Sequence, residues 1–344
     1  MSCLTTRRIA RATAAGGAFC RRLPTARRTS LAAMAAIALV VGADHALAQV
    51  APPAGGLTVQ QVRPNVHVAA GFENGNVLIV TTDSGTLLVD AQSAARVAAL
   101  DSALGRLRAP RVRTVVNTHH HGDHTEGNAH FRALGARVYA HAAARVQAAK
   151  DTVIPEWNDW HRTPLASAAM PTHDVRDSLV LWMGSERVVL LHAPRAHTDG
   201  DLMAWLPGAN VLHIGDILEV GAPPFIDWWA GGTLEGMVAA IDRVLALVND
   251  ETAIVPGHGA VATRGDLRRY REMLVTVDRR VRAQVARGDG TAAVLASRPA
   301  REWEASLGGE RHADHFVRLV DYGARRDEGA PRGPHASRDQ RRSR

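Results

Sequence analysis

The chain has 344 residues, of which 46% are hydrophobic and 22% are charged, a composition typical of a globular protein rather than a disordered one. Its formal net charge of +7 is concentrated at the two ends, because residues 1–48 carry +6 and residues 323–344 carry +4. The intervening residues 49–322 carry −3. A phosphate-binding face is therefore not expected on this part of the chain, and nucleic acid is excluded as an expected partner.

The first 48 residues have the pattern of an export signal. An arginine-rich stretch precedes an apolar run of 11 residues, 31–41, which is too short to span a bilayer. Residues 46–48 read ALA and match the small-residue pattern of a cleavage site, so we expect cleavage after Ala48. The pair Arg27-Arg28 resembles a twin-arginine signal. We therefore expect a periplasmic or secreted protein, with a disordered N-terminus as the alternative.

The remaining composition limits the chemistry of the mature chain. Both cysteines, Cys3 and Cys20, lie in the predicted signal, so the mature chain has no disulfide, no cysteine nucleophile and no thiolate metal ligand. No later segment is apolar for 18 residues, and no membrane span is expected. Residues 323–344 lack large apolar side chains, which predicts a disordered basic tail.

Residues 49–322 are predicted to form one α/β catalytic domain. In chain order the patterns predict strands at 57–62, 66–70, 76–81 and 86–90, a helix at 94–107, a strand at 112–117, helices at 127–136 and 142–151, a loop or lid at 152–175, strands at 178–182, 187–191, 202–205 and 211–214, a helix at 233–248, a strand at 252–255 and a helix at 267–287. This order indicates two similar halves, each a sheet covered by helices on one face. Two such sheets packed together form an αββα sandwich.

Metal-binding side chains are concentrated directly after the predicted strand 112–117. Residues 117–124 read NTHHHGDH, and His119 and His121 project to the same side of an extended chain. After the turn at Gly122, two more donors follow at Asp123 and His124. Neutral imidazole and carboxylate are the ligands that Zn²⁺ takes where no thiolate is present. By strand alternation His120 is expected to point away from the metals.

Three further donors each follow a predicted strand and a tight turn: His197, Asp216 and His258. A repeated order of strand, turn and donor is typical of a scaffold that presents a site on one rim. Asp90 ends an apolar strand and is a candidate to orient a metal-binding histidine, with an ordinary turn residue as the alternative.

The ordered motifs H-x-H-x-D-H, a distant histidine, Gly-Asp and Pro-Gly-His resemble the metallo-β-lactamase superfamily over residues 66–259. The resemblance implies an αββα sandwich and a two-zinc site. By this resemblance the first metal is held by His119, His121 and His197, the second by Asp123, His124 and His258, and Asp216 bridges the two, as in the glyoxalase-II-like and lactonase-like branches.

Part of the sequence is also similar to the zinc β-lactamases that use a cysteine ligand, over residues 197–207. The chain departs from that branch at two positions. Asp216 stands where those enzymes carry the cysteine, and Glu219 stands where they carry a lysine for the antibiotic's carboxylate. An acid at this position would repel a carboxylate. A β-lactam is therefore only one of the expected substrate classes.

We expect an exported binuclear zinc hydrolase that uses a metal-bound hydroxide to cleave a carbonyl-type bond in a small molecule, whether a lactone, a thioester or an amide including a β-lactam. Asp123 is the expected catalytic residue, because it can accept a hydrogen bond from the attacking water. The alternatives are a mononuclear iron oxidoreductase similar to the persulfide dioxygenases, and a non-catalytic zinc-binding protein.

Aromatic side chains are the candidates for substrate binding. Trp228 and Trp229 follow Asp216 in the chain and are expected to form a wall of the substrate pocket, with packing under the next helix as the alternative. Trp157 and Trp160 in the predicted loop raise the same choice.

Overall fold

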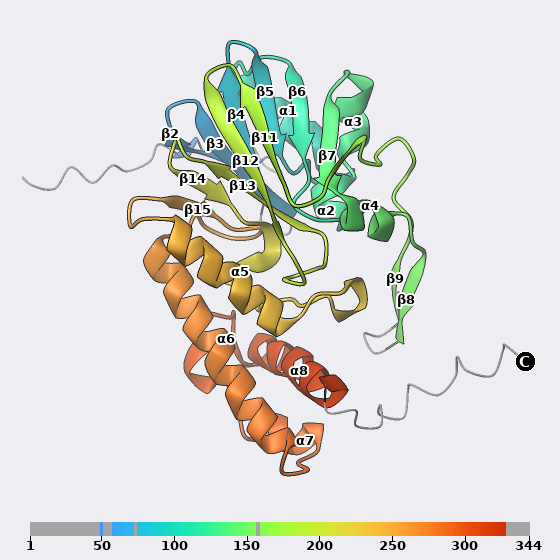
Figure 1. Cartoon of the computed structure of the whole chain (residues 1–344), viewed down its shortest axis with the longest axis vertical. Coiled ribbons are helices and arrows are strands. Elements are labelled where there is room, and N and C mark those ends of the chain that lie inside the picture. Colours follow the sequence, from blue (N-terminus) through green and yellow to red (C-terminus); the bar gives the residue numbers. More distant parts are fainter. Residues whose placement is uncertain (1–48, 51–56, 72–73, 156–158, 328–344) are drawn as a thin grey trace, which may run out of the picture. The chain divides into compact units, whose positions relative to one another are not determined.

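The computed structural model describes residues 49–50, 57–71, 74–155 and 159–327, which form two β-sheets flanked by helices (Figure 1). These residues belong to Leu47–Arg344, one of the two units into which the chain divides. The predicted export signal and most of the predicted tail lie outside the described residues. Trp157 also lies outside them.

The strands are β1 (Gln49–Val50), β2 (Thr58–Arg63), β3 (Val66–Gly71), β4 (Asn74–Thr82), β5 (Gly85–Val89), β6 (Val112–Val116), β7 (Arg137–His141), β8 (Thr152–Ile154), β9 (Trp160–Arg162), β10 (His173–Val175), β11 (Ser178–Met183), β12 (Glu186–Ala193), β13 (Asp201–Leu206), β14 (Val211–His213) and β15 (Ala253–Val255). The helices are α1 (Val97–Arg106), α2 (Gly122–Thr125), α3 (Asn128–Ala133), α4 (Ala142–Ala148), α5 (Leu234–Leu247), α6 (Arg264–Val285), α7 (Thr291–Ala296) and α8 (Glu310–Asp327), with short 3₁₀ turns η2 (Gly215–Ile217), η3 (Trp228–Ala230) and η4 (Arg301–Trp303).

The first sheet has the order β1-β2-β3-β4-β5-β6-β7-β10 and the second β11-β12-β13-β14-β15, while β8 and β9 form a separate hairpin. Within the first sheet β5, β6 and β7 are parallel neighbours, and in the second sheet β14 is parallel to β15. Parallel neighbours have their carboxyl ends at the same edge of a sheet. The residues that follow β6, β14 and β15 therefore begin where the carboxyl ends of parallel strands meet, and a site can be assembled there.

Side-chain alternation along the strands explains the layers. On β4, Leu78 and Val80 are buried between the two sheets together with Leu190 of the second sheet. The intervening Ile79 faces the opposite way and packs with Leu100 of α1. Both faces of the first sheet are thus apolar and must be covered. The second sheet covers one face, and helix α1 packs on the other.

Helices also cover the outer face of the second sheet (Figure 1). Leu212 of β14 belongs to a buried cluster with Ile241 of α5, Leu274 of α6 and Phe316 of α8. The order from one side to the other is helices, sheet, sheet, helices. The predicted αββα sandwich is confirmed.

The segment 152–175 is more regular than its sequence indicates. We expected a loop or lid, but it contains the β8–β9 hairpin and the strand β10, which adds to the edge of the first sheet by pairing with β7. These strands have three residues each, so periodicity has too few positions to reveal them. β7 was also missed, because it lies directly between two helices.

The C-terminal helices α7 and α8 were not predicted, and α8 corrects the predicted start of the tail. It continues to Asp327, five residues beyond the expected domain end at Tyr322. Gly323 and Ala324 are buried, and a Cβ at Gly323 would overlap the ring of Trp228. Small residues therefore continue the packed helix face into a segment whose basic composition suggested disorder. The rest of the predicted tail lies outside the described residues.

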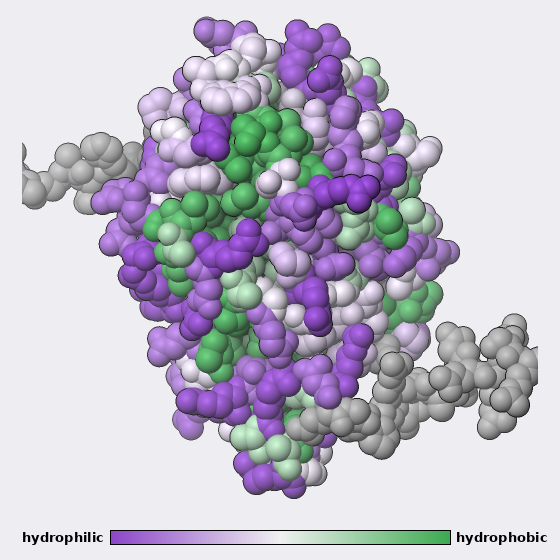
Figure 2. Space-filling model, viewed as in Figure 1, coloured by the Kyte–Doolittle hydropathy of each residue, from purple (hydrophilic) through white to green (hydrophobic). Residues whose placement is uncertain are grey.

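The face drawn in Figure 2 is largely hydrophilic, with apolar patches, one of them in the region of β11 in Figure 1. β11 is an edge strand, and its outward-facing Val180 and Trp182 are 41% and 63% exposed. Among the described residues, no helix has the length and apolar character needed to cross a membrane.

Candidate metal centre

Each predicted donor lies just beyond a strand. β6 ends at Val116, and the chain continues through His119 and His121 into the short helix α2, which carries Asp123 and His124. The remaining three donors follow β12, β14 and β15, and they are His197, Asp216 and His258. The structure brings all seven predicted donors together in two adjoining groups.

Two glycines provide the space for this convergence. A Cβ on Gly257 would overlap Oδ1 of Asp216, and a Cβ on Gly75 would overlap the imidazole of His124. Side chains larger than hydrogen are therefore excluded at both positions by the donors themselves. This explains the glycine of the Pro-Gly-His motif on physical grounds.

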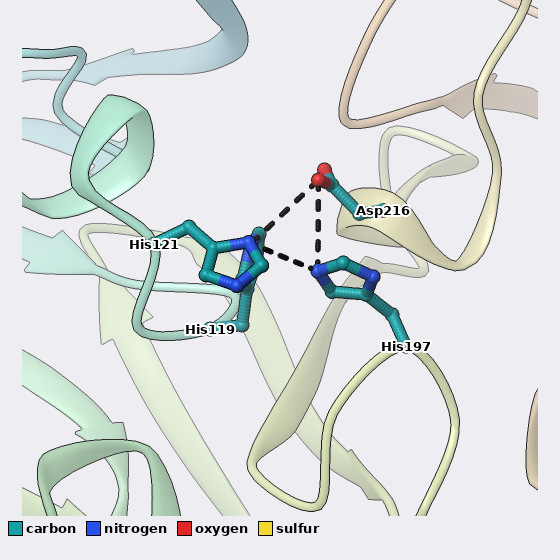
Figure 3. A group of neighbouring side chains, drawn as sticks. All are labelled: His119, His121, His197 and Asp216. Atoms are coloured by element: carbon teal, nitrogen blue, oxygen red, sulfur yellow. Dashed lines mark hydrogen bonds and ion pairs between the residues drawn. The ribbon is translucent and has the colours of Figure 1, made fainter. Parts of the chain in front are cut away.

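The first group contains His119, His121, His197 and Asp216 (Figure 3). Nε2 of His197 lies 3.2 Å from Nδ1 of His121 and 3.7 Å from Oδ2 of Asp216. Nε2 of His119 also lies 3.7 Å from Oδ2 of Asp216. One nitrogen of each imidazole and one carboxylate oxygen therefore face a common point.

The second group contains Asp123, His124 and His258. Nε2 of His124 and Nε2 of His258 are 3.3 Å apart, and each lies 3.2 Å from Oδ2 of Asp123. Asp216 also reaches this group, since its Oδ1 is 3.4 Å from His124 and its Oδ2 is 3.6 Å from His258. The carboxylate of Asp216 thus lies between the two groups.

These separations fit a tetrahedral cation. Zinc binds imidazole nitrogen and carboxylate oxygen at about 2.0–2.2 Å, so two ligand atoms of one ion lie roughly 3.4 Å apart. The donor separations in both groups scatter around this value. Nε2 of His119 and Oδ1 of Asp216 are buried with no hydrogen-bond partner among the described residues. Buried polar atoms of this kind are costly unless an ion or another polar group satisfies them.

The outward-facing nitrogens of the imidazoles are held by other groups. Nδ1 of His124 lies 2.8 Å from Asp90, which also accepts hydrogen bonds from the backbone and hydroxyl of Thr118. Nδ1 of His197 lies 2.8 Å from the carbonyl of Phe225. Such partners fix the tautomer and the ring orientation of metal-binding histidines. Of the two roles considered for Asp90, orienting a metal-binding histidine or serving as an ordinary turn residue, the structure supports the first.

Asp227 was missed at the sequence level and is buried beside the first group. Its Oδ2 lies 3.0 Å from Nε2 of His121 and 2.7 Å from Nη1 of Arg162. Its Oδ1 accepts hydrogen bonds from the backbone of Trp229 and Ala230. Asp227 lies more than 100 residues from His121 in the chain, with no motif to connect them.

His120 lies on the Asp227 side of this arrangement. Its Nε2 is 3.8 Å from Oδ2 of Asp227, and the ring is not part of the two groups that contain the predicted donors. Asp227 already has hydrogen-bond partners in His121 and Arg162. We therefore interpret the contact among His120, His121 and Asp227 as support for the first group and not as a third metal site.

A cavity of about 490 Å³ opens beside the donors. Its lining consists of His121, Gly122, Asp123, Trp160, Arg162, Asp216, Glu219, Phe225, His258 and His315. The aromatic rings of Trp160 and Phe225 lie 6.1 Å apart and form an apolar wall. The side chain of Asp123, in the second group, is 31% exposed, whereas the side chain of Asp216 is 7% exposed. Asp123 is therefore available to a molecule in the cavity.

The prediction that Trp228 and Trp229 bind substrate needs correction, because neither lines this cavity. Trp228 is buried, its Nε1 donates a hydrogen bond to the carbonyl of Leu319 on α8, and its ring packs near Tyr322. The ring of Trp229 lies 5.4 Å from that of Tyr322. The structure therefore shows packing rather than substrate binding, but these contacts are to α8 and not to the next helix in the chain, which the sequence had suggested.

The pKa values of the imidazoles differ between the two groups. Burial, together with the neighbouring imidazoles, holds the pKa of His119 well below its usual range, and burial lowers the pKa of His197 to about 4. Burial also lowers the pKa of His258, but the adjacent Asp216 and Asp123 together outweigh this effect and raise it to about 10. Nearby carboxylates likewise raise the pKa of His124 well above its usual value, against the effect of burial. In the metal-free chain the imidazoles of His119 and His197 are neutral near pH 7, whereas those of His124 and His258 hold protons.

The carboxylates follow the same electrostatics. Burial raises the pKa of Asp123 and of Asp216, but the adjacent His124 and His258 hold both values below the usual range. The carboxylates of Asp123 and Asp216 therefore stay ionised and can only accept hydrogen bonds or bind cations. Glu219 is different, because burial and the charge of Asp216 raise its pKa to about 8.

These pKa directions predict a pH dependence of metal binding. Metal binding requires neutral imidazoles, so a cation must displace the protons of His124 and His258, whereas His119 and His197 have none to lose at pH 7. Affinity at the second group should rise by about tenfold per pH unit for each displaced proton between pH 6 and 8. Zinc titration of the metal-free protein with a pH indicator will count the protons.

The control for this titration is His258→Gln, which should release fewer protons on zinc binding than the unaltered chain. Equal proton release by both proteins, or none by either, would contradict the assigned protonation states.

Comparison with known proteins places these residues in context. A family model described as the metallo-beta-lactamase superfamily matches residues 70–259, which is more than half of the chain. All seven predicted donors lie within the matched residues.

The chain is also similar to individual relatives. It is 24% identical over 219 residues to the metallo-beta-lactamase type 2 of Bacillus cereus, covering 61% of this chain and 80% of the relative. It is 31% identical over 221 residues to the hydroxyacylglutathione hydrolase of Rhodobacter capsulatus, covering 63% of this chain and 73% of the relative.

Two solved structures share the fold. A metallo-beta-lactamase from Pontibacter korlensis has a TM-score of 0.51 at 19% identity, covering 63% of this chain and 98% of that one. A stereoselective inverting sec-alkylsulfatase from Pseudomonas sp. has a TM-score of 0.59 at 19% identity, covering 82% of this chain and 51% of that one. This chain therefore spans about half of the alkylsulfatase, and at such identities the likeness concerns the fold alone.

Proposed function

Because the chain belongs to the metallo-beta-lactamase superfamily, we propose that it is an exported hydrolase that holds two zinc ions and cleaves a carbonyl-type bond in a small molecule. His119, His121 and His197 would hold one ion, and Asp123, His124 and His258 the other. The observation that carries this proposal is the position of the Asp216 carboxylate between the two groups. Its two oxygens lie 3.4–3.7 Å from imidazole nitrogens of both groups. A single metal held by His119, His197 and Asp216 would leave the adjoining group of Asp123, His124 and His258 without an ion.

Two bound zinc ions would supply a water activated as a nucleophile near neutral pH and a Lewis acid for the carbonyl oxygen. Carboxylate side chains of the protein orient the attacking water and the metal-binding imidazoles. Asp123 stays ionised and faces the cavity, so it can accept a hydrogen bond from the attacking water and direct the water's lone pair toward the carbonyl carbon. Asp90 and Asp227 hold the rings of His124 and His121 in place. No serine, cysteine or lysine nucleophile is required.

The substrate class is an acyl compound, namely a lactone, a thioester or an amide including a β-lactam. The names of the relatives, a beta-lactamase and a hydrolase of hydroxyacylglutathione, support an acyl substrate. The wall formed by Trp160 and Phe225 favours a substrate with an apolar part. Export rests on the sequence pattern of residues 1–48.

The test is a hydrolysis panel of lactones, thioesters and β-lactams with the zinc-loaded protein, compared with Asp123→Ala under the same conditions. We expect turnover of at least one class by the unaltered protein and none by the variant, with unchanged circular dichroism. Turnover retained by Asp123→Ala would contradict the role of this carboxylate. Oxygen uptake with one bound iron, instead of hydrolysis, would favour the oxidoreductase alternative.

A further inference from the structure

The β8–β9 hairpin places a permanent positive charge at the rim of the cavity. Trp160 and Arg162 are two residues apart on β9, so their side chains extend from the same face of the strand. Both line the cavity beside the donors, and both also line a neighbouring cavity of about 530 Å³. Among the described residues that line the first cavity, Arg162 is the one lysine or arginine.

The guanidinium of Arg162 has only part of its hydrogen-bonding capacity satisfied. The side chain is 10% exposed, and its Nη1 donates to Oδ2 of Asp227 at 2.7 Å. Nε and Nη2 are buried and have no hydrogen-bond partner among the described residues. A guanidinium carries five N–H donors and no acceptor. A buried guanidinium with a single hydrogen bond has lost its hydrogen bonds to water without gaining protein acceptors in their place, which is unfavourable.

Asp227 cannot supply the missing contacts. Its Oδ2 serves Arg162 and His121, and its Oδ1 accepts from two backbone N–H groups. The other carboxylates of the cavity, on Asp123, Asp216 and Glu219, belong to the metal side of it. The remaining N–H groups of Arg162 thus have no acceptor among the described residues, while the side chain borders both cavities, from which a bound molecule can supply one.

We infer that Arg162 binds an anionic group of the substrate, a carboxylate or a group of similar charge, while the acyl carbon lies beside the metal donors. The inference rests on the proposed function and narrows its substrate class to anionic acyl compounds. Arg162 connects to the first group through only two contacts, 2.7 Å to Asp227 and 3.0 Å from Asp227 to His121. The anion and the scissile bond would thus lie a few bonds apart, with the intervening part of the substrate against Trp160 and Phe225.

The test compares an anionic ester with its neutral twin, mono-para-nitrophenyl adipate and the methyl ester of that compound, using the zinc-loaded protein. Arg162→Gln should raise KM for the anionic ester by about 10- to 100-fold more than KM for the neutral ester, the loss expected for one charged hydrogen-bonded contact, and any effect through Asp227 should be common to both esters. Arg162→Lys, which keeps the charge, should recover part of the loss. Arg145→Gln removes an exposed arginine paired with Asp174, outside both cavities, and is the control for net charge.

A second measurement separates this inference from the proposed function. Isothermal titration calorimetry with adipate measures anion binding without turnover, and Arg162→Gln should weaken it by a similar factor. If neither ester is hydrolysed but adipate binding still depends on Arg162, the anion site stands and the proposed function fails. If Arg162→Gln slows both esters equally and leaves adipate binding unchanged, Arg162 acts only through Asp227, and the inference is wrong.

Discussion

Replacing Asp216 by asparagine should lower kcat/KM for the best substrate of the hydrolysis panel by roughly a thousandfold. The amide keeps the size of the side chain but removes the charge. In the native chain the two carboxylate oxygens lie within 3.7 Å of His119, His124, His197 and His258, so the loss affects both donor groups. The metal content should also fall, because a neutral amide cannot balance two divalent cations placed side by side.

The matched control is Asp199→Asn, an acid close to His197 in the chain that belongs to neither donor group. Activity and metal content are measured on the same preparations by kinetics and elemental analysis. If Asp216→Asn retained full activity with both metals bound, the bridging position of this carboxylate would have no functional meaning.

Removal of the metals by a chelator should abolish hydrolysis, and added zinc should restore it. Stability should change in the same direction, because an ion that binds only the folded chain stabilises it by about 4 kcal/mol when present at a thousand times its dissociation constant. With an unfolding entropy of about 2.1 cal/mol/K per residue, that corresponds to a rise of roughly 5–7 °C in Tm for a chain of this size. Differential scanning calorimetry of metal-free and zinc-loaded protein measures this shift.

The chelation experiment also has an internal control. His121→Ala removes one donor of the first group and should reduce the zinc-dependent rise in Tm without lowering the Tm of the metal-free protein to the same extent. A chelated protein that retained its full activity would argue against any role of a metal in the reaction.

The predicted donors came together in the structure because each belongs to a local motif. His119, His121, Asp123 and His124 are close in sequence. The other three donors, His197, Asp216 and His258, each follow a strand and a tight turn. The strands β12, β14 and β15 run in the same direction in the second sheet, so the three donors that follow them lie at one edge of it. The packing of the two sheets against each other brings these donors to the four that follow β6 in the first sheet. Glycines such as Gly257, which leave room for a carboxylate, belong to the same motifs.

The residues that support and extend the site could not be predicted in this way. Asp227 and Arg162 come from two distant segments, and their roles depend on the placement of the β8–β9 hairpin, which has too few residues per strand to show a period. The error at Trp228 has a related cause. Its partners are on α8, a helix rich in charged residues that was not expected, so nothing in the sequence identified the helix that covers this ring.

We propose that one chain holds two metal ions, with Asp216 between them. Elemental analysis of the purified protein without residues 1–48 tests this claim most directly. We predict about two zinc ions per chain, falling to about one or fewer in Asp216→Asn. One iron per chain, or two zinc ions retained by the variant, would contradict it.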